Sequence, residues 1–599
     1  MQFSSCGSQS PFCVRDQRPV DTWSSRALLA ACALSALPLA AQDVATRQDP
    51  FRVDGSAQLR YSAYRSQRSS FPANAVYLTA APTAYVYGVA VPFEVSFSNV
   101  GVDFRQPFNR FSLRPRYRWA EAQLGWINPR YGEFTLAGIT MLGAGLRLRP
   151  GRWDVAGSFG RLNRATTLDT LAGQLNPESF DRFGYALRVG YGTERARVSL
   201  TVLAAEDRPE SLRFDEAVGR RQLLDVEPAA NQAGSLEFAV PFGRTVTLET
   251  EAAVSVFTEN LTLDGAGLDS SLADAGVPRW FADAVGANLS TDYYTALQTR
   301  LRYAGTGPRA PELYVSYRRV DPNYRSMGAL FFQNDLAHVL VGGSLRPWRP
   351  LRLRASVGRQ RDNLTGVKAA TSVRVIGSAR ADFQHEGLAL SLDYYNYAND
   401  QQPRLAQVGD SLRIASVNQS LSFSPAYTLQ RERHVHVVAS TLSRNVVRDF
   451  LGGLSADAAF RDLNTDVVTL TYSLSWLRTA TTASVTGNYT SLGRGGEDPA
   501  EAGGYVSTGA NVSLSQGFAA GKGNASANAG LFAQQFASDA QPGSRPLATL
   551  GLSGGYRLAE RLRAHLSCQY SAGPATGRLA QTADRFRDVR VDTRLTYRL

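Results

Sequence analysis

Apolar and polar residues alternate along most of the chain, from about residue 50 to its end. Because successive side chains of a β-strand point to opposite faces, this alternation predicts strands with one apolar and one polar face. Four such apolar rows are Phe51, Val53, Ala57, Leu59 and Tyr61; Tyr85, Tyr87, Val89, Val91, Phe93, Val95 and Phe97; Phe183, Tyr185, Leu187, Val189 and Tyr191; and Val468, Leu470, Tyr472, Leu474 and Trp476. Each row is long enough to cross a bilayer, since a tilted strand needs about 9 to 11 residues.

Short and long connections alternate between these predicted strands. Tight links at Gly243–Arg244, His385–Glu386 and Arg478–Thr479 are separated by long polar segments such as 205–234 and 258–292. A soluble β-sandwich also alternates, but its strands are usually about 5 to 6 residues long and its connections follow no short-and-long rule. The pattern therefore predicts an all-β fold, a closed antiparallel transmembrane β-barrel with short periplasmic turns and long extracellular loops.

Counting strands in this way predicts a barrel of about 24, within a range of about 22 to 26. The count of about 24 treats Phe111–Ile127 as one strand with a phase slip near Trp119, and the count is about 25 if this segment is two strands. Pro115 lies inside the segment and fits a bulge, because a central ladder has no place for proline. We prefer the even number, which puts both termini in the periplasm.

The N-terminal residues predict export. Arginines precede an apolar run over residues 27–39, and Ala40 and Ala41 follow before Gln42, the order of regions in a secretory signal peptide. We therefore expect residues 1–41 to be a cleaved signal, 42–50 a short N-terminal segment and 51–599 the barrel. The alternative is a lipidated N-terminus at Cys32, since Leu29-Ala30-Ala31-Cys32 resembles a lipobox, but only five apolar residues separate Arg26 from this cysteine.

The last residues carry a resemblance to a known class of proteins. Val589, Val591, Leu595, Tyr597 and Leu599 share one face of the C-terminal segment. This segment resembles the C-terminal targeting strand of bacterial outer-membrane β-barrel proteins, although that family usually ends in an aromatic residue and this chain ends in Leu599. The resemblance implies a bacterial outer membrane location, contact with outer-membrane lipid, and recognition of Val591, Leu595, Tyr597 and Leu599 by the barrel-assembly machinery.

TonB-dependent receptors resemble the chain in barrel size, but they carry an N-terminal plug of roughly a quarter of the chain. Here the first predicted strand begins at Phe51, so we expect a porin-like transport barrel without a plug domain. The lumen could then be closed by long extracellular loops or, from the periplasmic side, by residues 98 to 110.

Charge adds a candidate chemistry for the lumen. The chain has 64 basic and 52 acidic residues, and nearly all of the basic ones are arginines. Many arginines alternate with the apolar rows and are candidate lumen-lining residues: Arg114, Arg116, Arg147, Arg300, Arg302, Arg352, Arg354, Arg590 and Arg594. Such a lining favours anions. The alternative, which we prefer for most of these arginines, is pairing with carboxylates such as Glu94, Glu121 and Asp592 in cross-strand ladders.

The sequence offers little catalytic chemistry. It contains no G-x-S-x-G elbow, H-E-x-x-H pair or Walker motif, and His434 and His436 share a strand face without a third metal ligand. We therefore expect no enzyme activity, no catalytic or metal-binding residues and no cofactor, and no nucleic acid as partner.

Two functions fit these sequence features. The first is transport of solutes or a polymer across the outer membrane, with anions preferred. The second is a barrel that displays its loops for adhesion, surface binding or assembly and conducts little; a barrel-embedded hydrolase is the least favoured. Segments 205–234 and 258–292 separate the first two, because loops that fold inward favour transport and an external platform favours display.

Overall fold

The computed structural model describes residues 51–66, 73–100, 109–166, 179–212, 226–263, 286–329, 332–404, 413–450, 462–494, 504–536, 545–574 and 585–599. The predicted signal peptide with its alternative lipidation site at Cys32, and the segment 42–50, lie outside these ranges and stay predictions. Of the predicted loops 205–234 and 258–292, residues 213–225 and 264–285 lie outside them as well, while residues 205–208 and 230–234 belong to strands rather than to a loop.

Strands make up nearly all of the described chain. The first half contains β1 (Phe51–Asp54), β2 (Ser56–Arg65), β3 (Asn74–Ala80), β4 (Thr83–Val86), β5 (Val89–Ser98), β6 (Arg110–Leu113), β7 (Arg116–Tyr117), β8 (Ala120–Ile127), β9 (Leu136–Ala137), β10 (Met141–Leu148), β11 (Trp153–Asn163), β12 (Asp181–Gly192), β13 (Arg197–Arg208), β14 (Ala230–Phe242), β15 (Val246–Thr258) and β16 (Thr291–Ala304). A 3₁₀ turn, η2 (Pro209–Ser211), follows β13.

The second half continues with β17 (Glu312–Val320), β18 (Gly328–Ala329), β19 (Leu336–Trp348), β20 (Leu351–Arg361), β21 (Ala370–His385), β22 (Leu388–Pro403), β23 (Ile414–Gln430), β24 (His434–Asp449), β25 (Leu463–Trp476), β26 (Thr481–Arg494), β27 (Tyr505–Phe518), β28 (Gly523–Phe536), β29 (Arg545–Arg557), β30 (Leu562–Pro574) and β31 (Arg585–Arg598). The 3₁₀ turn η6 (Ala519–Gly521) joins β27 to β28. Among the described residues, no helix is both long and apolar enough to cross a bilayer.

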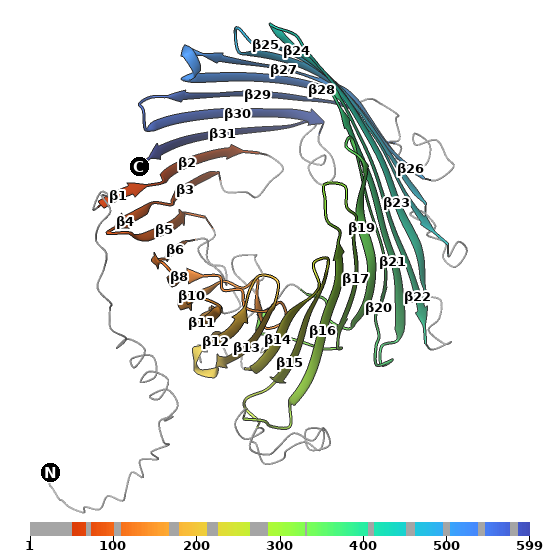
Figure 1. Ribbon diagram of the computed structural model, residues 1–599. Coiled ribbons are helices and arrows are strands. Elements are labelled where there is room, and N and C mark those ends of the chain that lie inside the picture. The colour runs from red at the N-terminus through yellow and green to blue at the C-terminus, as the bar shows by residue number, and fades with distance from the viewer. Residues whose placement is uncertain are drawn as a thin grey trace, which may run out of the picture. The chain divides into compact units, whose positions relative to one another are not determined.

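The strands form one antiparallel sheet that closes on itself. The last strand, β31, pairs with β30 on one side and with β2 on the other, with Arg594 opposite Arg60 and Leu595 opposite Leu59. Figure 1 shows this closure, where the blue C-terminal strand lies beside the red first strands. Because β1, β4 and β7 each continue a longer strand, the 29 segments of the sheet make 26 barrel strands. This lies within the predicted range, two strands above the preferred count.

Two segments predicted as single strands are pairs of strands. The row from Tyr85 to Phe97 is divided between β4 and β5 by a turn at Tyr87 and Gly88, both with positive φ, as tight hairpins require. Likewise, Phe111–Ile127 is divided by a turn at Arg118 and Trp119, with Tyr117 paired to Ala120. The single-strand prediction is therefore wrong in both places. Pro115 lies between β6 and β7, where the ladder is interrupted.

All the short turns lie at one rim of the barrel and the longer connections at the other. Tight turns join β12 to β13, β14 to β15 and β21 to β22, while the long connections follow the opposite strand ends. The chain ends at the short-turn rim, where Leu599 N–H donates to the Gly55 carbonyl over 3.0 Å. β5 ends and β6 begins at the long-loop rim, so the described ends of the segment 98 to 110 do not lie on the predicted periplasmic side.

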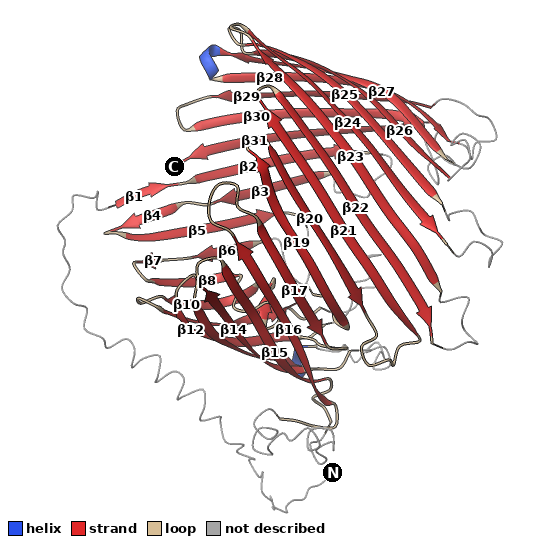
Figure 2. Ribbon diagram, turned by 45° about the vertical axis from the view of Figure 1, so that its right-hand side comes forward, coloured by secondary structure: helices blue, strands red, loops and turns tan. Residues whose placement is uncertain are grey.

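One face of the wall is apolar and exposed, as a membrane requires. The side chains of Tyr185, Leu470 and Leu531 are 66%, 56% and 63% exposed on this outer face. Closing the sheet pairs every strand edge, which is the condition for strands to cross hydrocarbon. The wall is uneven in height, because β8 and β10 have 8 residues each while β21 and β22 have 16, and Figure 2 shows these long strands.

Candidate functional site: the barrel lumen

The inner face of the wall is the candidate functional site. Strand register fixes which side chains face inward, because cross-strand partners share a face and neighbours along a strand do not. By this criterion eight of the nine candidate arginines lie on the face opposite the exposed apolar rows, and Arg114, between β6 and β7, lies on the same side because it pairs with inward Glu94. For example, Leu353 pairs with Leu345 and Ala381 on the outer face, and therefore Arg352 and Arg354 face the lumen.

Five of these arginines have carboxylate partners. The closest nitrogen–oxygen distances are 3.7 Å for Arg114–Glu94, 2.5 Å for Arg147–Asp154, 2.6 Å for Arg302–Glu312, 3.4 Å for Arg354–Asp382 and 2.8 Å for Arg590–Asp592. Four of these pairs join neighbouring strands of the wall, whereas Arg590 and Asp592 lie two residues apart on the same strand, β31.

The other four arginines are Arg116, Arg300, Arg352 and Arg594. All four are exposed on the inner face, and none has a carboxylate within ion-pair distance among the described residues. Arg300 lies over the ring of Tyr314, with 5.4 Å between its guanidinium carbon and the ring centre. These guanidinium groups add positive charge to the lumen without a carboxylate in ion-pair contact among the described residues.

A hollow of about 520 Å³ lies against the inner wall between β17 and β23. Its charged lining residues are Glu312, Arg352, Arg354, Arg380 and Asp393. Arg380 pairs with Asp382 at 2.8 Å and with Asp393 at 3.2 Å, so these carboxylates are already engaged. The hollow thus offers a guanidinium group, that of Arg352, to an anionic ligand.

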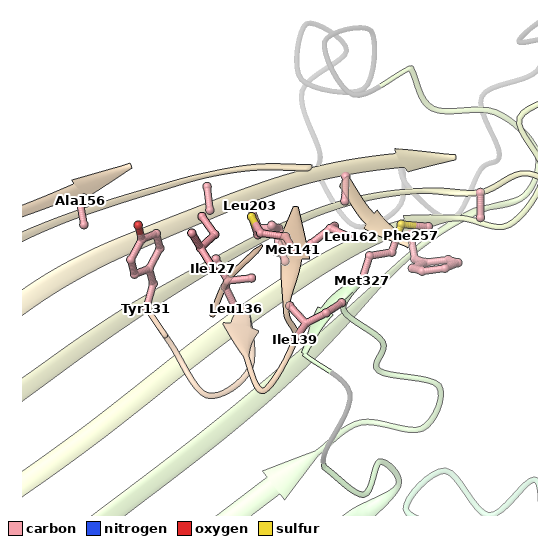
Figure 3. Packing of buried hydrophobic residues seen from close by; sticks show 14 residues of the cluster. Ile127, Tyr131, Leu136, Ile139, Met141, Ala156, Leu162, Leu203, Phe257 and Met327 are labelled. Carbon is pink, nitrogen blue, oxygen red and sulfur yellow. The ribbon is translucent and has the colours of Figure 1, made fainter. Parts of the chain in front are cut away.

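Two segments of the long-loop rim fold inward and pack on the inner face of β8 to β17. The first is residues 128–140, which contain β9. The second, called 321–335 below, is described over residues 321–329, which contain β18, and over 332–335. β9 and β18 pair in parallel, Leu136 with Gly328 and Ala137 with Ala329. Figure 3 shows the buried cluster between segments and wall, with Leu136 and Met327 from the segments and Leu203 and Phe257 from the wall among its members.

The close fit depends on small residues. A Cβ atom at Gly328 would lie 2.5 Å from the Thr135 carbonyl oxygen and 2.7 Å from Leu203 Cδ2. The wall beneath is also built from small side chains, with Ala156, Ala186 and Ala233 buried in the same cluster.

Polar groups of the wall bind the backbone of both segments. The Glu251 carboxylate accepts from the backbone N–H of Glu133 and Phe134, each over 3.2 Å. Arg188 donates to the Tyr131 carbonyl and forms a bidentate ion pair with Glu237, with both nitrogen–oxygen distances at 2.9 Å. The Met327 N–H donates to the Asn231 side chain over 3.1 Å.

The centre of the second segment is an aromatic cluster. Tyr324, which is 1% exposed, packs against Phe134 and Phe332 with ring centres 6.0 Å and 5.3 Å away, and its hydroxyl donates to the Phe134 carbonyl. Burial raises the pKa of Tyr324 well above its ordinary value, so this hydroxyl stays protonated. Tyr324 and Phe332 therefore pack inside the barrel mouth, against Phe134 of the first segment.

The opposite part of the inner wall has a different surface. Inward positions of β25 from Thr465 to Ser475, and of β26 from Thr482 to Thr490, carry only Thr, Ser, Val and Asn. Their hydroxyl groups bond across the strands, with Thr471–Thr486 at 3.1 Å, Ser475–Thr482 at 2.9 Å, Ser484–Ser513 at 2.6 Å and Ser526–Ser553 at 2.6 Å. This surface on β25 to β29, whose described side chains carry no charge apart from Arg545 and Arg557 at the two ends of β29, is called the hydroxyl wall below.

Comparisons with known proteins found only remote similarity in structure. No protein family and no curated protein matches the chain. The P pilus usher PapC translocation pore is 11% identical with a TM-score of 0.38, covering 91% of this chain and 99% of the usher. The copper transporter OprC is 8% identical with a TM-score of 0.39, covering 91% and 81%. OpdK of Pseudomonas aeruginosa, solved with vanillate, is 12% identical with a TM-score of 0.28, covering 62% and 93%.

The closed sheet and its apolar outer face decide the class. The chain is an outer-membrane β-barrel. Its short-turn rim therefore faces the periplasm and its long-loop rim the exterior.

Sequence reasoning missed the inward segments of this barrel. Residues 128–140 and 321–335 have no period of their own, and the groups that hold them, Glu251 and Asn231, look like ordinary inward polar residues of a strand. The available signal was the row of small inward side chains on β11 to β14, which leaves room for a second layer.

Proposed function

We propose that this outer-membrane β-barrel transports solutes or a polymer through its lumen and prefers anions. One observation carries the proposal: Arg116, Arg300, Arg352 and Arg594 are exposed on the inner face without carboxylate partners among the described residues. A barrel of 26 strands encloses far more space than inward side chains fill, since barrels of about 16 to 18 strands already leave a channel.

The inward segments support transport over display. They lie on the β8 to β17 side of the wall and narrow the lumen there, whereas the described hydroxyl wall stays free of them. A narrowed lumen beside a polar wall is the arrangement of a selective channel, because constriction brings a passing solute within reach of the charged groups. Arg147, Arg188 and Glu237 also line a smaller hollow beside the first segment.

The test is the reversal potential of the purified protein in a planar bilayer under a salt gradient. We expect anion selectivity that fades at high salt, because ions screen the arginine field. Arg352→Glu should shift the reversal potential toward cation selectivity. The matched control is Arg359→Glu on the outer face of the same strand, which makes the same change in charge and should leave selectivity unchanged. Cation selectivity of the unmodified protein would refute the anion preference.

One observation favours the alternative function, the display of loops at the cell surface: several strands are longer than a bilayer crossing needs. β21 and β22 have 16 residues and β23 has 17, whereas a tilted strand needs about 9 to 11 to cross the bilayer. The outer row of β22 changes from Leu392 and Tyr394 to Asn396 and Asp400, so its upper part extends beyond hydrocarbon. If the protein shows no conductance in the same bilayer experiment, display of this extended rim becomes the better proposal.

Export and assembly follow from the same proposal. Residues 1–41 would be removed as a signal peptide, so N-terminal sequencing of membrane fractions should begin near Gln42. The β31 strand, with Val591, Leu595, Tyr597 and Leu599 in its outward register, would be the strand that the barrel-assembly machinery recognises.

A further inference from the structure

The outer face of the barrel carries an arginine cluster where the apolar rows end at the long-loop rim. On β20 the outward row passes from Ala355 and Val357 to Arg359 and Arg361. On β17 it passes from Tyr317 to Arg319. These arginines lie on the face opposite the lumen, and none of them takes part in the site proposed above.

Register brings the three arginines together. Arg319 lies opposite Ala337 of β19, and Ala337 lies opposite Arg361 of β20. Arg319 and Arg361 are thus two strands apart, with about 10 Å between their Cα atoms. The side chain between them is the single methyl group of Ala337. Arg359 lies two residues nearer the apolar row, opposite Val339.

The cluster has little negative charge of its own. Arg359 and Arg361 are exposed and have no carboxylate within ion-pair distance among the described residues. Arg319 contacts Asp321 at 3.5 Å, and that carboxylate also accepts the Thr295 N–H. By contrast, Arg444 of β24, also outward and above the apolar row, pairs with Asp466 at 3.7 Å.

An arginine that faces hydrocarbon costs free energy, and this cost falls only near the interface. This cost is smallest if the arginines of the cluster lie at headgroup depth, with the half-exposed Val339, Val341 and Val357 beside them in the acyl-chain region. Guanidinium groups bind phosphate through paired N–H donors, and phosphate is the anion present at this depth.

We propose that Arg319, Arg359 and Arg361 form a binding site for the phosphate groups of lipopolysaccharide, the glycolipid of the outer leaflet. The sugar-phosphate headgroup would lie over Ala337, and its acyl chains would pack on Val339, Val341 and Val357. The site is independent of transport through the lumen, because it lies on the other face of the wall.

The experiment titrates the full-length protein in detergent with diphosphorylated lipid A, with its dephosphorylated form, and with inorganic phosphate, and measures binding by native mass spectrometry and thermal unfolding. We expect lipid A to bind and to raise the unfolding temperature, and the dephosphorylated form to bind at least about tenfold more weakly, as the loss of charge-assisted hydrogen bonds implies. If inorganic phosphate stabilises the protein as well as lipid A does, the site takes free phosphate and the lipid assignment is overturned.

Two variants locate the binding. The double variant R359A/R361A should weaken lipid A binding at least about tenfold, while the control R444A should bind as the unmodified protein does. Ala337→Glu places a carboxylate between Arg319 and Arg361 and should weaken binding similarly without removing an arginine. If either variant folds and binds lipid A with unchanged affinity, the proposal is wrong.

Discussion

Two parts of the wall differ in what lies on their inner face. The inward segments pack on β11 to β15, here called the covered wall, whereas no described segment packs on the hydroxyl wall of β25 to β29. Both have small inward side chains and apolar outward ones. On the covered wall, Arg188, Asn231 and Glu251 point at the backbone of the inward segments and bond it. On the hydroxyl wall, Ser484 bonds Ser513 and Thr471 bonds Thr486, so the wall satisfies its own polar groups.

This difference shows what allows a loop to fold into a wide barrel. A buried segment must find partners for its backbone N–H and C=O groups. Small wall residues give the space, and the partners come from charged and amide side chains and from wall hydroxyl groups that are not bonded to each other, since Ser255 donates to the Arg325 carbonyl and Thr201 to the Tyr131 carbonyl. The hydroxyl wall gives the space without the partners, because its short hydroxyl groups bond each other.

The largest effect is expected when an arginine is placed under the inward segments. Ala233 is 5% exposed in the cluster with Leu136 and Met327. Ala233→Arg would bury an unpaired charge and should cost about 3 to 5 kcal/mol, enough to release the segments. Ser484→Arg on the hydroxyl wall should be mild. Trypsin cleavage after Arg130 and Arg325 reports release, and equal cleavage of both variants would contradict the comparison.

A second prediction concerns the outer face of the barrel, which is apolar both at the covered wall and at the hydroxyl wall. Val189→Arg at the covered wall and Leu470→Arg at the hydroxyl wall should each cost about 2 to 4 kcal/mol at mid-membrane depth. Thr469→Arg, on the inner face beside Leu470, should cost much less. Urea unfolding of protein refolded into vesicles gives these free energies. A cost for Thr469→Arg as large as for Leu470→Arg would show that the face assignment is wrong.

A smaller effect is expected from adding one methyl group. At Gly328 the added Cβ would overlap the Thr135 carbonyl oxygen, so Gly328→Ala should destabilise the docked segments by about 1 to 3 kcal/mol. Gly487 of β26 has no atom within 4 Å of such a Cβ, and Gly487→Ala is the matched control. Hydrogen exchange of residues 321–329 measures the difference, and unchanged exchange in Gly328→Ala would argue against close packing.

The smallest effect is a dependence on pH at the end of the second segment. Burial raises the pKa of Asp335, but the Lys368 ammonium group and the N–H groups of Leu364 and Asn363 outweigh it and hold the pKa below its ordinary value. A lowered pKa contributes stability that is present above the ordinary value, about 4, and is lost as the pH falls through the folded value.

We therefore expect exchange of the Asn363 and Leu364 amides to quicken at acidic pH relative to their intrinsic rates. Asp335→Asn should show the faster exchange already at neutral pH, with little further change on acidification. An identical pH response in the unmodified protein and in Asp335→Asn would exclude Asp335 as its origin.

The two strand assignments that failed have one physical cause. Partners across a two-residue turn share a face, so a hairpin shifts the alternation by one residue. The phase slip near Trp119 is the trace of such a turn, although it resembles a bulge within one strand. At Tyr85, Val86 and Tyr87 every side chain is apolar or aromatic, and therefore the reversal of direction leaves no polar gap in the sequence.

The sequence by itself determined the barrel, its closing strand and the faces of its side chains. Those properties depend on the period of two, which each strand carries locally in residues such as Leu353 beside Arg354. Tertiary structure decided which arginines form ion pairs, because the register of the strands decides which carboxylates lie near them. In this register Arg354 pairs with Asp382, whereas Arg352 has no carboxylate within ion-pair distance among the described residues. Tertiary structure also decided that residues 128–140, 321–329 and 332–335 fold inward. Their partners Glu251, Asn231 and Arg188 come from strands far away in the chain, and no local pattern encodes a contact between such distant residues.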